Sequence, residues 1–382
     1  MAAEPRLVII ATHPIQYQVP LFRALAADPR VDSHVLFLSR HGLESRVDPG
    51  YGVEFAWDID LLGGYESSFL PNVREHARPG GVLSYVNVTV GRALRALDPD
   101  AILFLGVRSA TSLAAFGWAL RRGVRRLYRA ESSILERRPA RSRALAGMLL
   151  RQMTAVLPIG TANDLYYETL RIPKSRRHLA PYTVDNGFFV RASMPRTVAR
   201  DRLSLSPDET IVLYVGKLAG WKDPGTIVAA AALGEEPVRV VVAGDGDLRG
   251  ELERQAGNLD VPLTVLGFMN QTEVPAAYAA ADVLILPSLI EPWGLVVNEA
   301  MCAALPVVVS SQVGARLDLV TSGENGAVFR AGDAVSLAGA LAPLLCSPEL
   351  REQFGRASYD RIAAWDIPHT VEGIVQGVSA DA

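Results

Sequence analysis

Short runs of continuous apolar residues, separated by longer segments of helical periodicity, constrain this sequence more than any other feature. The runs are rich in Val, Ile and Leu and are bounded by Gly, Pro, Asp or Ser. Continuous apolarity without alternation is typical of parallel strands covered on both faces, and the helical segments between them complete βαβ units. The predicted strands of the first series are Leu7–Ala11, Val35–Leu38, Ala101–Leu105, Leu127–Arg129 and Ala155–Pro158. Those of the second series are Ile211–Val215, Val238–Ala243, Leu263–Leu266, Val283–Pro287 and Pro306–Ser310.

The two series predict two α/β domains, in agreement with a length of 382 residues, which is too long for one ordinary hydrophobic core. Turn residues collect within 181–200. We therefore place the first domain at 1–188 and the second at 189–365, followed by a terminal helix over 366–382. The stretch 51–72 alternates with a period of two around Gly63-Gly64, which predicts a hairpin excursion from the first domain.

Composition and charge limit the class of protein. The chain is 49% hydrophobic and 21% charged, with 38 basic against 41 acidic residues, a balance that favours neither nucleic acid nor another polyanion as partner. Cys302 and Cys346 have no paired spacing, which argues against a disulfide framework and a structural zinc site. The apolar run Leu7–Ala11 is too short for the core of a signal peptide, and no apolar window reaches the length of a membrane span. We therefore expect a cytoplasmic protein.

Glycine, lysine and aromatic residues follow the strands of the second series, at the edge where open parallel sheets bind ligands. Gly216 would let the backbone approach a ligand closely, and the ammonium groups of Lys217 and Lys222 in a strand-to-helix loop suit a phosphate. Two solvated loop lysines are the ordinary alternative. Gly244 opens a Gly-Asp-Gly turn. Phe268 follows another strand, where a ring either flanks a nucleobase or belongs to the core.

The segment Glu291–Glu299, EPWGLVVNE, places two carboxylates at the start of a predicted helix. Its proline and glycine leave the first N–H groups of that helix free to hold an anion or a hydroxyl. Leu295 and Glu299 are four residues apart and share one helix face, so Glu299 would lie below the opening that Glu291 rims. A carboxylate accepts two hydroxyl hydrogen bonds at once, which is what a sugar or ribose diol offers.

The order of these motifs resembles the donor-binding domain of the retaining GT-B glycosyltransferases, family 4 of the sequence-based classification. The resemblance covers about 180–335 and rests on Gly-Lys-x4-Lys, Gly-Asp-Gly, Leu-Gly-Phe, Ala-Ala-Asp282 and Glu-x7-Glu, with Pro306-Val-Val-Val-Ser310, Val313-Gly314, Glu324-Asn-Gly326 and Val184-Asp185-Asn186. It implies two Rossmann-like domains facing each other across a cleft. The C-terminal helix is then expected to cross back to the first domain.

The resemblance also implies roles for residues that match the family's motifs. Lys217 and Lys222 would contact the diphosphate of a nucleotide sugar, Glu291 would bind hydroxyls of the transferred sugar, and Glu299 would accept both ribose hydroxyls. The other implied donor-binding residues are Gly216, Gly244, Gly267, Phe268, Met269, Gly294, Leu295 and Val296. The nucleotide sugar is then a substrate, and neither a cofactor nor a metal is expected. The usual Gly-Arg of the family is Gly-Lys here, which keeps the charge but loses the bidentate fork.

The first half of the chain carries a weaker signal. His13 directly follows a predicted strand, where it could take a proton or bind a phosphate or an acceptor hydroxyl, so it joins Glu291 and Lys222 as a catalytic candidate. The alternative is a packing or capping histidine. Many relatives place a His-Asp pair near the position of Glu131, so the family's catalytic histidine does not transfer simply. The acceptor-side candidates are His13, Gln16, Tyr17, Arg108 and Glu131.

Arginines cluster within 121–129 and again over Arg137–Arg151, where they border an apolar stretch. A basic amphipathic segment can bind peripherally to the inner, anionic face of a membrane. A solvated helix face is the interpretation that we favour for this segment.

The sequence thus predicts a retaining, metal-independent glycosyltransferase. It would move a sugar from a nucleotide-diphosphate sugar, a UDP-sugar before a GDP-sugar, to a hydroxyl of a glycan, a lipid-linked sugar or a small natural product. The enzyme alternative is a nucleotide-sugar epimerase, which needs no acceptor, or a sugar phosphorylase. The non-enzyme alternative is a GT-B-like accessory subunit that binds a partner and no donor. Such subunits tend to lose the lysines and the glutamate pair, which are both present here.

Overall fold

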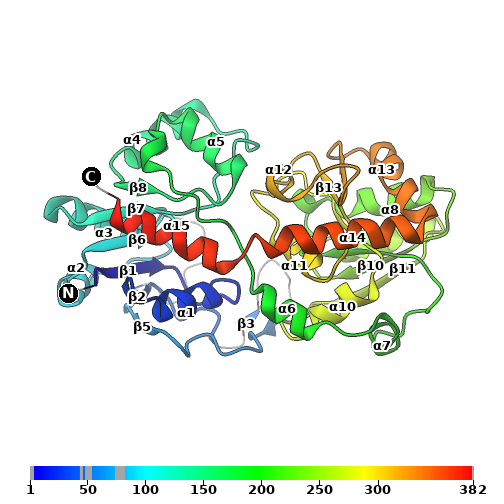
Figure 1. Ribbon diagram of the computed structural model, residues 1–382, viewed down its shortest axis with the longest axis horizontal. Coiled ribbons are helices and arrows are strands. Elements are labelled where there is room, and N and C mark those ends of the chain that lie inside the picture. The colour runs from blue at the N-terminus through cyan, green and yellow to red at the C-terminus, as the bar shows by residue number, and fades with distance from the viewer. Residues whose placement is uncertain (1–3, 44–45, 48–53, 74–81, 381–382) are drawn as a thin grey trace. The chain divides into compact units, whose positions relative to one another are not determined.

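The chain forms two α/β units in a computed structural model that describes residues 4–43, 46–47, 54–73 and 82–380. The first unit is built from Met1–Glu44, Asp60–Tyr182 and Ile367–Ala382, and the second from Ser45–Ile59 and Thr183–Asp366 (Figure 1). The prediction of two Rossmann-like domains is confirmed by their sheets, which have the same topology.

The sheet of the first unit has six parallel strands in the order β5-β2-β1-β6-β7-β8. The order runs outward from β1 in both directions, which leaves a topological switch point between β1 and β6, where doubly wound sheets bind ligands. The strands are β1 (Arg6–Ala11), β2 (Asp32–Phe37), β5 (Glu66–Phe69), β6 (Ala101–Phe104), β7 (Arg125–Tyr128) and β8 (Ala155–Val156).

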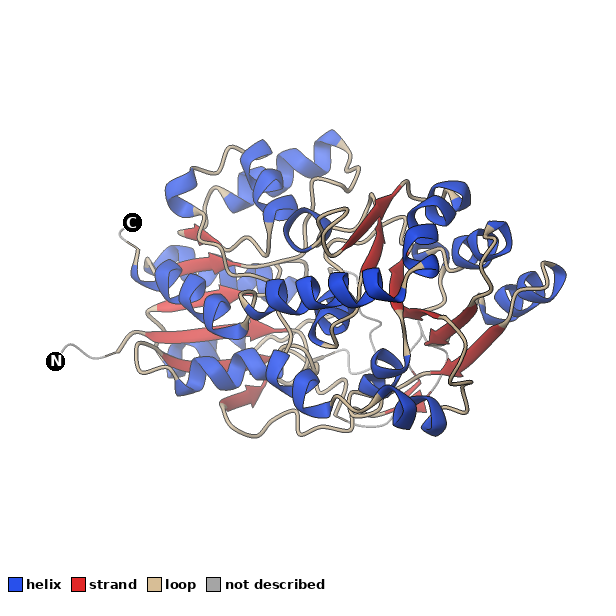
Figure 2. Cartoon of the chain, turned by 45° about the vertical axis from the view of Figure 1, so that its right-hand side comes forward, coloured by secondary structure: helices blue, strands red, loops and turns tan. Residues whose placement is uncertain are grey.

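Helices cover both faces of this sheet (Figure 2). Val8 and Ile10 of β1 pack with one set of helices, and Leu7 and Ile9 with the other, because successive side chains of a strand point to opposite faces. The first set is α2 (Val90–Leu97), α3 (Ala110–Arg122), α4 (Ala140–Leu150) and α5 (Thr161–Thr169). The second set is α1 (Val19–Ala27) and α15 (Ile367–Ser379), so the last helix of the chain belongs to the core of the first unit. A 3-10 turn, η1, lies at Lys174–Arg176.

The sheet of the second unit repeats this topology, with six parallel strands in the order β11-β10-β9-β12-β13-β14. Its switch point lies between β9 and β12. The strands are β9 (Ile211–Val215), β10 (Arg239–Ala243), β11 (Leu263–Gly267), β12 (Val283–Leu286), β13 (Val307–Ser310) and β14 (Gly326–Phe329). The helices are α6 (Asn186–Ala192), α7 (Arg196–Arg202), η2 (Gly220–Lys222), α8 (Gly225–Leu233), α9 (Arg249–Asn258), α10 (Val274–Ala280), α11 (Leu295–Cys302), α12 (Arg316–Leu319), α13 (Ala334–Cys346) and α14 (Pro348–Ala363).

The hairpin predicted over 51–72 is wrong in its pairing. Strand β4 (Glu54–Phe55) pairs antiparallel with β3 (Arg46–Val47), whereas β5 pairs parallel with β2 at the edge of the first sheet. Residues 51–53 of the predicted hairpin lie outside the described residues. Edge strands are half exposed and alternate like hairpin strands, so the period of two in β5 could not reveal its partner. The segment Ser45–Ile59, expected in the first domain, groups with the second unit.

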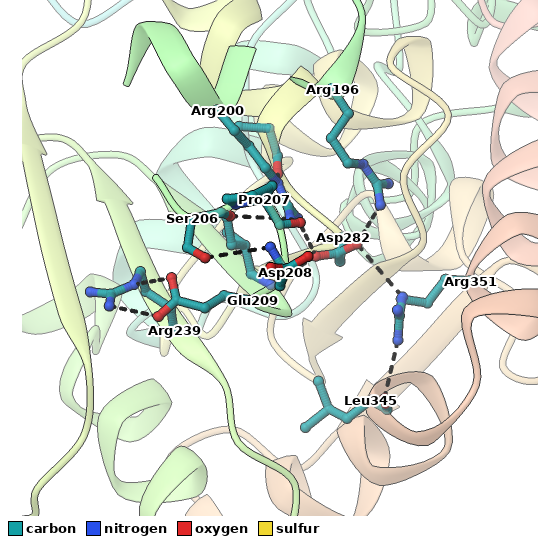
Figure 3. Close-up of polar contacts among 12 residues, drawn as sticks. Arg196, Arg200, Ser206, Pro207, Asp208, Glu209, Arg239, Asp282, Leu345 and Arg351 are labelled. Atoms are coloured by element: carbon teal, nitrogen blue, oxygen red, sulfur yellow. Dashed lines mark hydrogen bonds and ion pairs between the residues drawn. The ribbon is translucent and has the colours of Figure 1, made fainter. Parts of the chain in front are cut away.

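A buried carboxylate ties several elements of the second unit together (Figure 3). Asp282, at the amino end of β12, is 2% exposed. It accepts hydrogen bonds from Arg196 at 2.6 Å and from Arg200 at 2.8 Å, both on α7, and forms an ion pair with Arg351 of α14 at 3.7 Å. The backbone N–H of Ile211, which begins β9, also donates to it at 2.8 Å. One carboxylate therefore fixes α7 and α14 to the amino edge of the sheet.

Candidate functional site

The loops at the carboxyl ends of the second unit's strands bring the predicted site residues to one edge of the sheet. Because β10, β9 and β12 are neighbours, the loops that follow them are also neighbours. The loop after β9 carries Lys217 and Lys222, the turn after β10 begins at Gly244, and the loop after β12 carries Glu291. This edge includes the switch point between β9 and β12, the favoured ligand position in such sheets.

An ion pair joins the two loops that border the switch point. The ammonium Nζ of Lys222 contacts Oε2 of Glu291, and the Ser288 hydroxyl donates to the same oxygen at 3.2 Å. The Lys222 side chain is 21% exposed and that of Glu291 11%, so both groups are largely withdrawn from water but reachable from it. The sequence predicted both residues as site residues but not that they would pair. Any anion or sugar hydroxyl that binds here meets a positive and a negative group already held together.

The chain between Glu291 and the start of α11 is fixed by close backbone contacts. Gly294 has φ 99°, and a Cβ there would lie 2.7 Å from Cδ2 of Leu286. A Cβ on Gly314, after β13, would lie 1.9 Å from the carbonyl oxygen of Pro292, so only glycine allows this approach. The Gly314 N–H donates to the Glu291 carbonyl at 2.9 Å. These contacts hold the first turn of α11, whose N–H groups have no acceptor within the helix, at the sheet edge.

Trp293 fixes the same segment by packing into the core of the second unit. Its indole is 2% exposed, donates to Oδ1 of Asn298 at 2.9 Å, and stacks on Trp365 with ring centroids 5.5 Å apart. The apolar residues of EPWGLVVNE thus pack the helix down, while Leu295 and Val296 remain partly exposed at its start.

Glu299, one turn below the start of α11, sits in a poorly hydrated position. The hydroxyl of Tyr278 donates to its Oε2 at 2.5 Å. Burial raises the pKa of the Glu299 carboxyl from 4.5 to about 7, and the tyrosine hydrogen bond opposes that rise only in part. The group therefore changes charge near neutral pH, unlike an ordinary surface glutamate.

The glycine-rich turn after β10 is explained by contacts between loops. A Cβ on Gly244 would lie 1.9 Å from the carbonyl oxygen of Gly216, and one on Gly246 2.6 Å from that of Leu218. The Leu218 N–H donates to the Asp245 carbonyl at 2.9 Å, and the Tyr214 hydroxyl donates to the Lys217 carbonyl at 2.7 Å. These contacts position the backbone that carries Lys217. The close approach of the two loops thus explains why position 244, which was predicted to touch the donor, is a glycine.

A segment of the first half of the chain lies against the loop that follows β11, an arrangement that the sequence did not predict. The Trp57 ring is 6.2 Å from that of Phe268, centroid to centroid. Asn270 Nδ2 donates to the Ala56 carbonyl at 2.7 Å, and the N–H and hydroxyl of Thr272 both donate to Asp58. We call residues 56–58 the docked arm. It places a second aromatic ring beside Gly267, Phe268 and Met269, which are all partly exposed.

The acceptor-side candidates follow the strands of the first unit, in loops after β1, β6 and β7. His13 Nδ1 lies 3.0 Å from the Thr12 hydroxyl, and its ring lies edge-on to that of His41 at 5.1 Å. Gln16 is partly buried, and its Oε1 has no hydrogen-bond partner among the described residues. Arg108, after β6, is exposed. The loops after β1 and β6, which carry His13, Gln16, Tyr17 and Arg108, thus border the switch point, and Glu131 lies one strand further along the sheet.

Tyr17 and Glu131 are linked through Tyr182, the residue at which the chain leaves the first unit. The rings of Tyr17 and Tyr182 lie edge to face at 5.7 Å, and the Tyr182 hydroxyl donates to Glu131. The guanidinium of Arg129 lies over the Tyr182 ring at 4.9 Å and donates to the Pro181 carbonyl at 2.8 Å. Burial raises the pKa of Tyr17 above its usual value. The sequence missed Arg129 and Tyr182 here because neither belongs to a motif.

Two further predictions concern metals and membranes. Within the described ranges, no group of three His, Cys, Asp or Glu side chains could hold a metal ion. Helix α4 exposes Leu145 and Met148 beside Arg141 and Arg143, so the Arg137–Arg151 segment has apolar and basic side chains on its surface. None of the described helices is long and apolar enough to cross a membrane.

Comparison with known sequences finds a family match within the second unit. Residues 195–361 match the family described as Glycosyl transferases group 1. The chain is 31% identical over 232 residues to the alpha-D-kanosaminyltransferase of Streptomyces kanamyceticus, a match that covers 57% of this chain and 59% of that protein. It is 31% identical over 198 residues to the D-inositol 3-phosphate glycosyltransferase of Nocardia farcinica, which covers 48% of this chain and 44% of that protein. These matches therefore span less than two thirds of the relatives' length.

Comparison with solved structures identifies the fold of the whole chain. The sucrose-phosphate synthase of Thermosynechococcus elongatus superposes with a TM-score of 0.73 at 22% identity, covering 98% of both chains. HepE of Anabaena, solved in complex with UDP and glucose, superposes with a TM-score of 0.76 at 16% identity, covering 99% of this chain and 100% of that one. At such identities the likeness shows the fold alone, and that fold is GT-B, as expected from the motifs.

Proposed function

Because residues 195–361 form a glycosyl transferases group 1 domain within a GT-B fold, we propose that this protein is a retaining glycosyltransferase. It takes a nucleotide-diphosphate sugar, a UDP-sugar before a GDP-sugar, and transfers the sugar to a hydroxyl acceptor without a metal. The preference for UDP is supported by HepE, which was solved with UDP and with UDP-glucose. The relatives named above are a kanosaminyltransferase and a D-inositol 3-phosphate glycosyltransferase, and we keep a glycan, a lipid-linked sugar or a small natural product as the acceptor.

The observation that carries the proposal is the Lys222–Glu291 ion pair at the switch point, beside the start of α11. As the bond between sugar and diphosphate breaks, negative charge grows on the leaving diphosphate and positive charge on the sugar. An ammonium group and helix N–H groups stabilise the first, and a carboxylate stabilises the second. Lys222 and Glu291 are held together before substrate arrives, so little reorganisation is needed during the reaction.

The acceptor hydroxyl must lose a proton during transfer, and the candidates of the first unit supply groups for this. A retaining enzyme can pass that proton to the departing phosphate on the same face of the sugar. In that case His13, Gln16, Tyr17, Arg108 and Glu131 hold and orient the acceptor. If a side chain assists instead, His13 is the group whose ordinary pKa is closest to neutral.

The proposal is tested by incubating the protein with UDP-glucose or GDP-mannose and a panel of hydroxyl acceptors. Release of nucleoside diphosphate that depends on the acceptor, with a product whose anomeric coupling in proton NMR matches that of the donor, is the expected result. Conversion of the donor sugar without an acceptor would identify the epimerase alternative, and a requirement for inorganic phosphate the phosphorylase. Failure to bind any nucleotide sugar would favour the non-enzyme alternative, a GT-B-like accessory subunit.

Donor affinity is expected to rise with pH through neutrality because of Glu299. Only the ionised carboxyl can accept hydrogen bonds from both ribose hydroxyls, and its pKa is about 7. Below that pH the affinity for UDP-glucose should fall about tenfold for each pH unit. UDP-glucose is the suitable probe because its diphosphate diester does not titrate in this range. Calorimetric titrations between pH values of about 6 and 8 measure the effect, and Glu299→Gln should bind weakly and without this pH dependence.

The same carboxyl acts in the opposite direction on the stability of the unliganded protein. Its folded pKa lies above its unfolded value of 4.5, so the folded state holds this proton more tightly. This stabilising contribution to the free energy of unfolding is fully present at pH values below 4.5 and is lost as the pH rises to about 7.

The donor-binding titrations also give the contradicting result. If Glu299→Gln retained the wild-type pH dependence of donor binding, the ribose role of this residue would be wrong.

We expect Trp57→Ala to weaken nucleotide binding by about tenfold while leaving turnover at saturating donor nearly unchanged. The docked arm places the Trp57 ring beside Phe268, and an aromatic stacking contact with a base contributes roughly 1–3 kcal/mol. Competition by free UDP gives the dissociation constant. Trp118→Ala is the matched control, since this tryptophan is also partly buried but lies on α3 of the first unit. A Trp57→Ala protein with unchanged UDP affinity would restrict the arm to a structural role.

A further inference from the structure

A pocket with charged side chains in its lining lies in the second unit, with a volume of about 430 Å³. Three arginines and two carboxylates line it, together with residues 303–306 and Pro348 at the start of α14. The charged lining residues are Arg196, Asp282, Arg351, Glu352 and Arg356. None of these residues was assigned to the donor site.

The pocket is at the opposite edge of the sheet from the donor site. Asp282 immediately precedes β12, and Pro306 immediately precedes β13, so the pocket lies at the amino ends of these strands. The donor-site loops follow the carboxyl ends of the strands. Helix α11 begins at the donor site with Leu295 and ends at Cys302, just before the pocket residues Ala303 and Ala304. The two sites are therefore separate positions of one unit, joined by one helix.

The pocket has an excess of positive charge. Arg196, Arg200 and Arg351 surround the single carboxylate of Asp282 (Figure 3). At the rim, Arg356 pairs with Glu352 through one hydrogen bond of 2.7 Å. The three arginines and two carboxylates that line the pocket leave one positive charge in excess, and the guanidinium of the buried Arg200 lies behind Asp282.

Several of the guanidinium donors remain available to a ligand. Among the described residues, Arg196 contacts only Asp282, through Nη1, and Arg356 contacts only Glu352, also through Nη1. Arg351 uses Nη1 on the carbonyl oxygens of Leu344 and Leu345 and directs Nε towards Asp282, which leaves its Nη2. The first turn of α14, a helix of 16 residues, borders the pocket and adds the positive end of its dipole.

We propose that this pocket binds the phosphate group of a phosphorylated small molecule. A phosphate monoester is an anion near neutral pH, which suits the excess of positive charge in the pocket, and arginine forks bind its oxygens in pairs. The volume is that of a small-molecule site rather than of one ion, so the phosphoryl group carries an organic part. Arg196 and Arg356 hold the phosphate at the rim, while Arg200 and Arg351 keep Asp282 from repelling it.

The test measures binding of inorganic phosphate and of glucose 6-phosphate by phosphorus NMR, at constant ionic strength and a pH of about 8, where both probes are dianions. The key variant is Arg196→Gln/Arg356→Gln. These side chains are 51% and 67% exposed, so their replacement leaves the buried Arg200–Asp282 contact intact. Arg330→Gln is the control for loss of one exposed arginine, because Arg330 is 81% exposed and, within the described part of the chain, its side chain pairs only with Asp333. Lys217→Gln/Lys222→Gln removes the positive charge of the donor site instead.

Saturable binding of a probe to the wild type, weakened at least about tenfold in Arg196→Gln/Arg356→Gln and retained in both other variants, is the expected result. Tighter binding of glucose 6-phosphate than of phosphate would show that the pocket recognises the organic part. Equal binding of the two probes would show that it recognises the phosphate ion alone. Binding lost in the lysine variant but kept in the arginine variant would place the phosphate at the donor site and overturn the proposal. So would the absence of saturable binding to the wild type. Neither result depends on glycosyl transfer, so this inference and the proposed function fail separately.

Discussion

Replacing Lys222 with alanine is expected to lower the turnover of sugar transfer by about 10²–10³-fold, the effect of removing one preorganised group from a developing negative charge. Lys222 contacts Glu291 at the switch point of the second unit and is the cation that we propose for the leaving diphosphate. The change also leaves Glu291, whose side chain is 11% exposed, without its partner. Release of nucleoside diphosphate at saturating donor measures the turnover.

Two variants control this prediction. Lys174→Ala removes an exposed lysine of η1 in the first unit and should leave turnover unchanged. Lys222→Arg keeps the positive charge but changes the donor geometry, so it should recover part of the lost activity. Glu291→Ala should also lower turnover, with a smaller effect on affinity for free UDP, because its partner in the substrate is the sugar. Wild-type turnover in Lys222→Ala would remove Lys222 from the catalytic residues.

Replacing Asp282 with alanine is expected to destabilise the second unit by about 3–5 kcal/mol, the usual cost of breaking a buried ion pair by removing one partner. Arg200 is 4% exposed and would lose its carboxylate, while the Ile211 N–H would lose its acceptor (Figure 3). Urea unfolding followed by tryptophan fluorescence measures the effect. Four of the five tryptophans, Trp57, Trp221, Trp293 and Trp365, report on the second unit.

Asp208→Ala is the matched control for this prediction. Asp208 is the same residue type with the same charge as Asp282, but its side chain is exposed rather than buried. It should shift the unfolding midpoint little. Asp282→Asn should lie between the two, because an amide oxygen still accepts hydrogen bonds but carries no charge. Equal midpoints for Asp282→Ala and Asp208→Ala would contradict the view that Asp282 holds the helices to the sheet.

The buried strands and the donor-side residues could be predicted because both leave local signals. A strand such as β12, which is covered on both faces, is a short run of residues that is apolar at every position. Glu291, Gly294 and Glu299 lie within nine residues, so the spacing of one helix start brings them together. The ordered motifs then indicated the resemblance to the glycosyl transferases group 1 family, whose model matches residues 195–361.

The contacts that the sequence did not predict join residues far apart in the chain. The docked arm reaches Phe268 from Trp57, and three arginines of α7 and α14 reach Asp282. No periodicity links such positions. Strand β5 is partly exposed and polar, so only its parallel pairing with β2 identifies it. The acceptor side is defined by loops after separate strands, and its residues match no continuous motif.

The central claim is that the loops around Lys217 and Lys222 bind the diphosphate of a nucleotide sugar. Lysine occurs at only three positions of the chain, 174, 217 and 222. Reductive methylation with ¹³C-formaldehyde keeps the charge of each lysine, so three side-chain signals in ¹³C NMR report on every lysine. They are assigned by replacing one lysine at a time with arginine.

Titration with UDP, with GDP, ADP and TDP as competitors, is then the most direct measurement. The account predicts that the signals of Lys217 and Lys222 shift saturably with UDP, that UDP-glucose shifts them in the same way, and that the Lys174 signal does not move. Signals of Lys217 and Lys222 that stay in place with every nucleotide, or that move no more than that of Lys174, would contradict it.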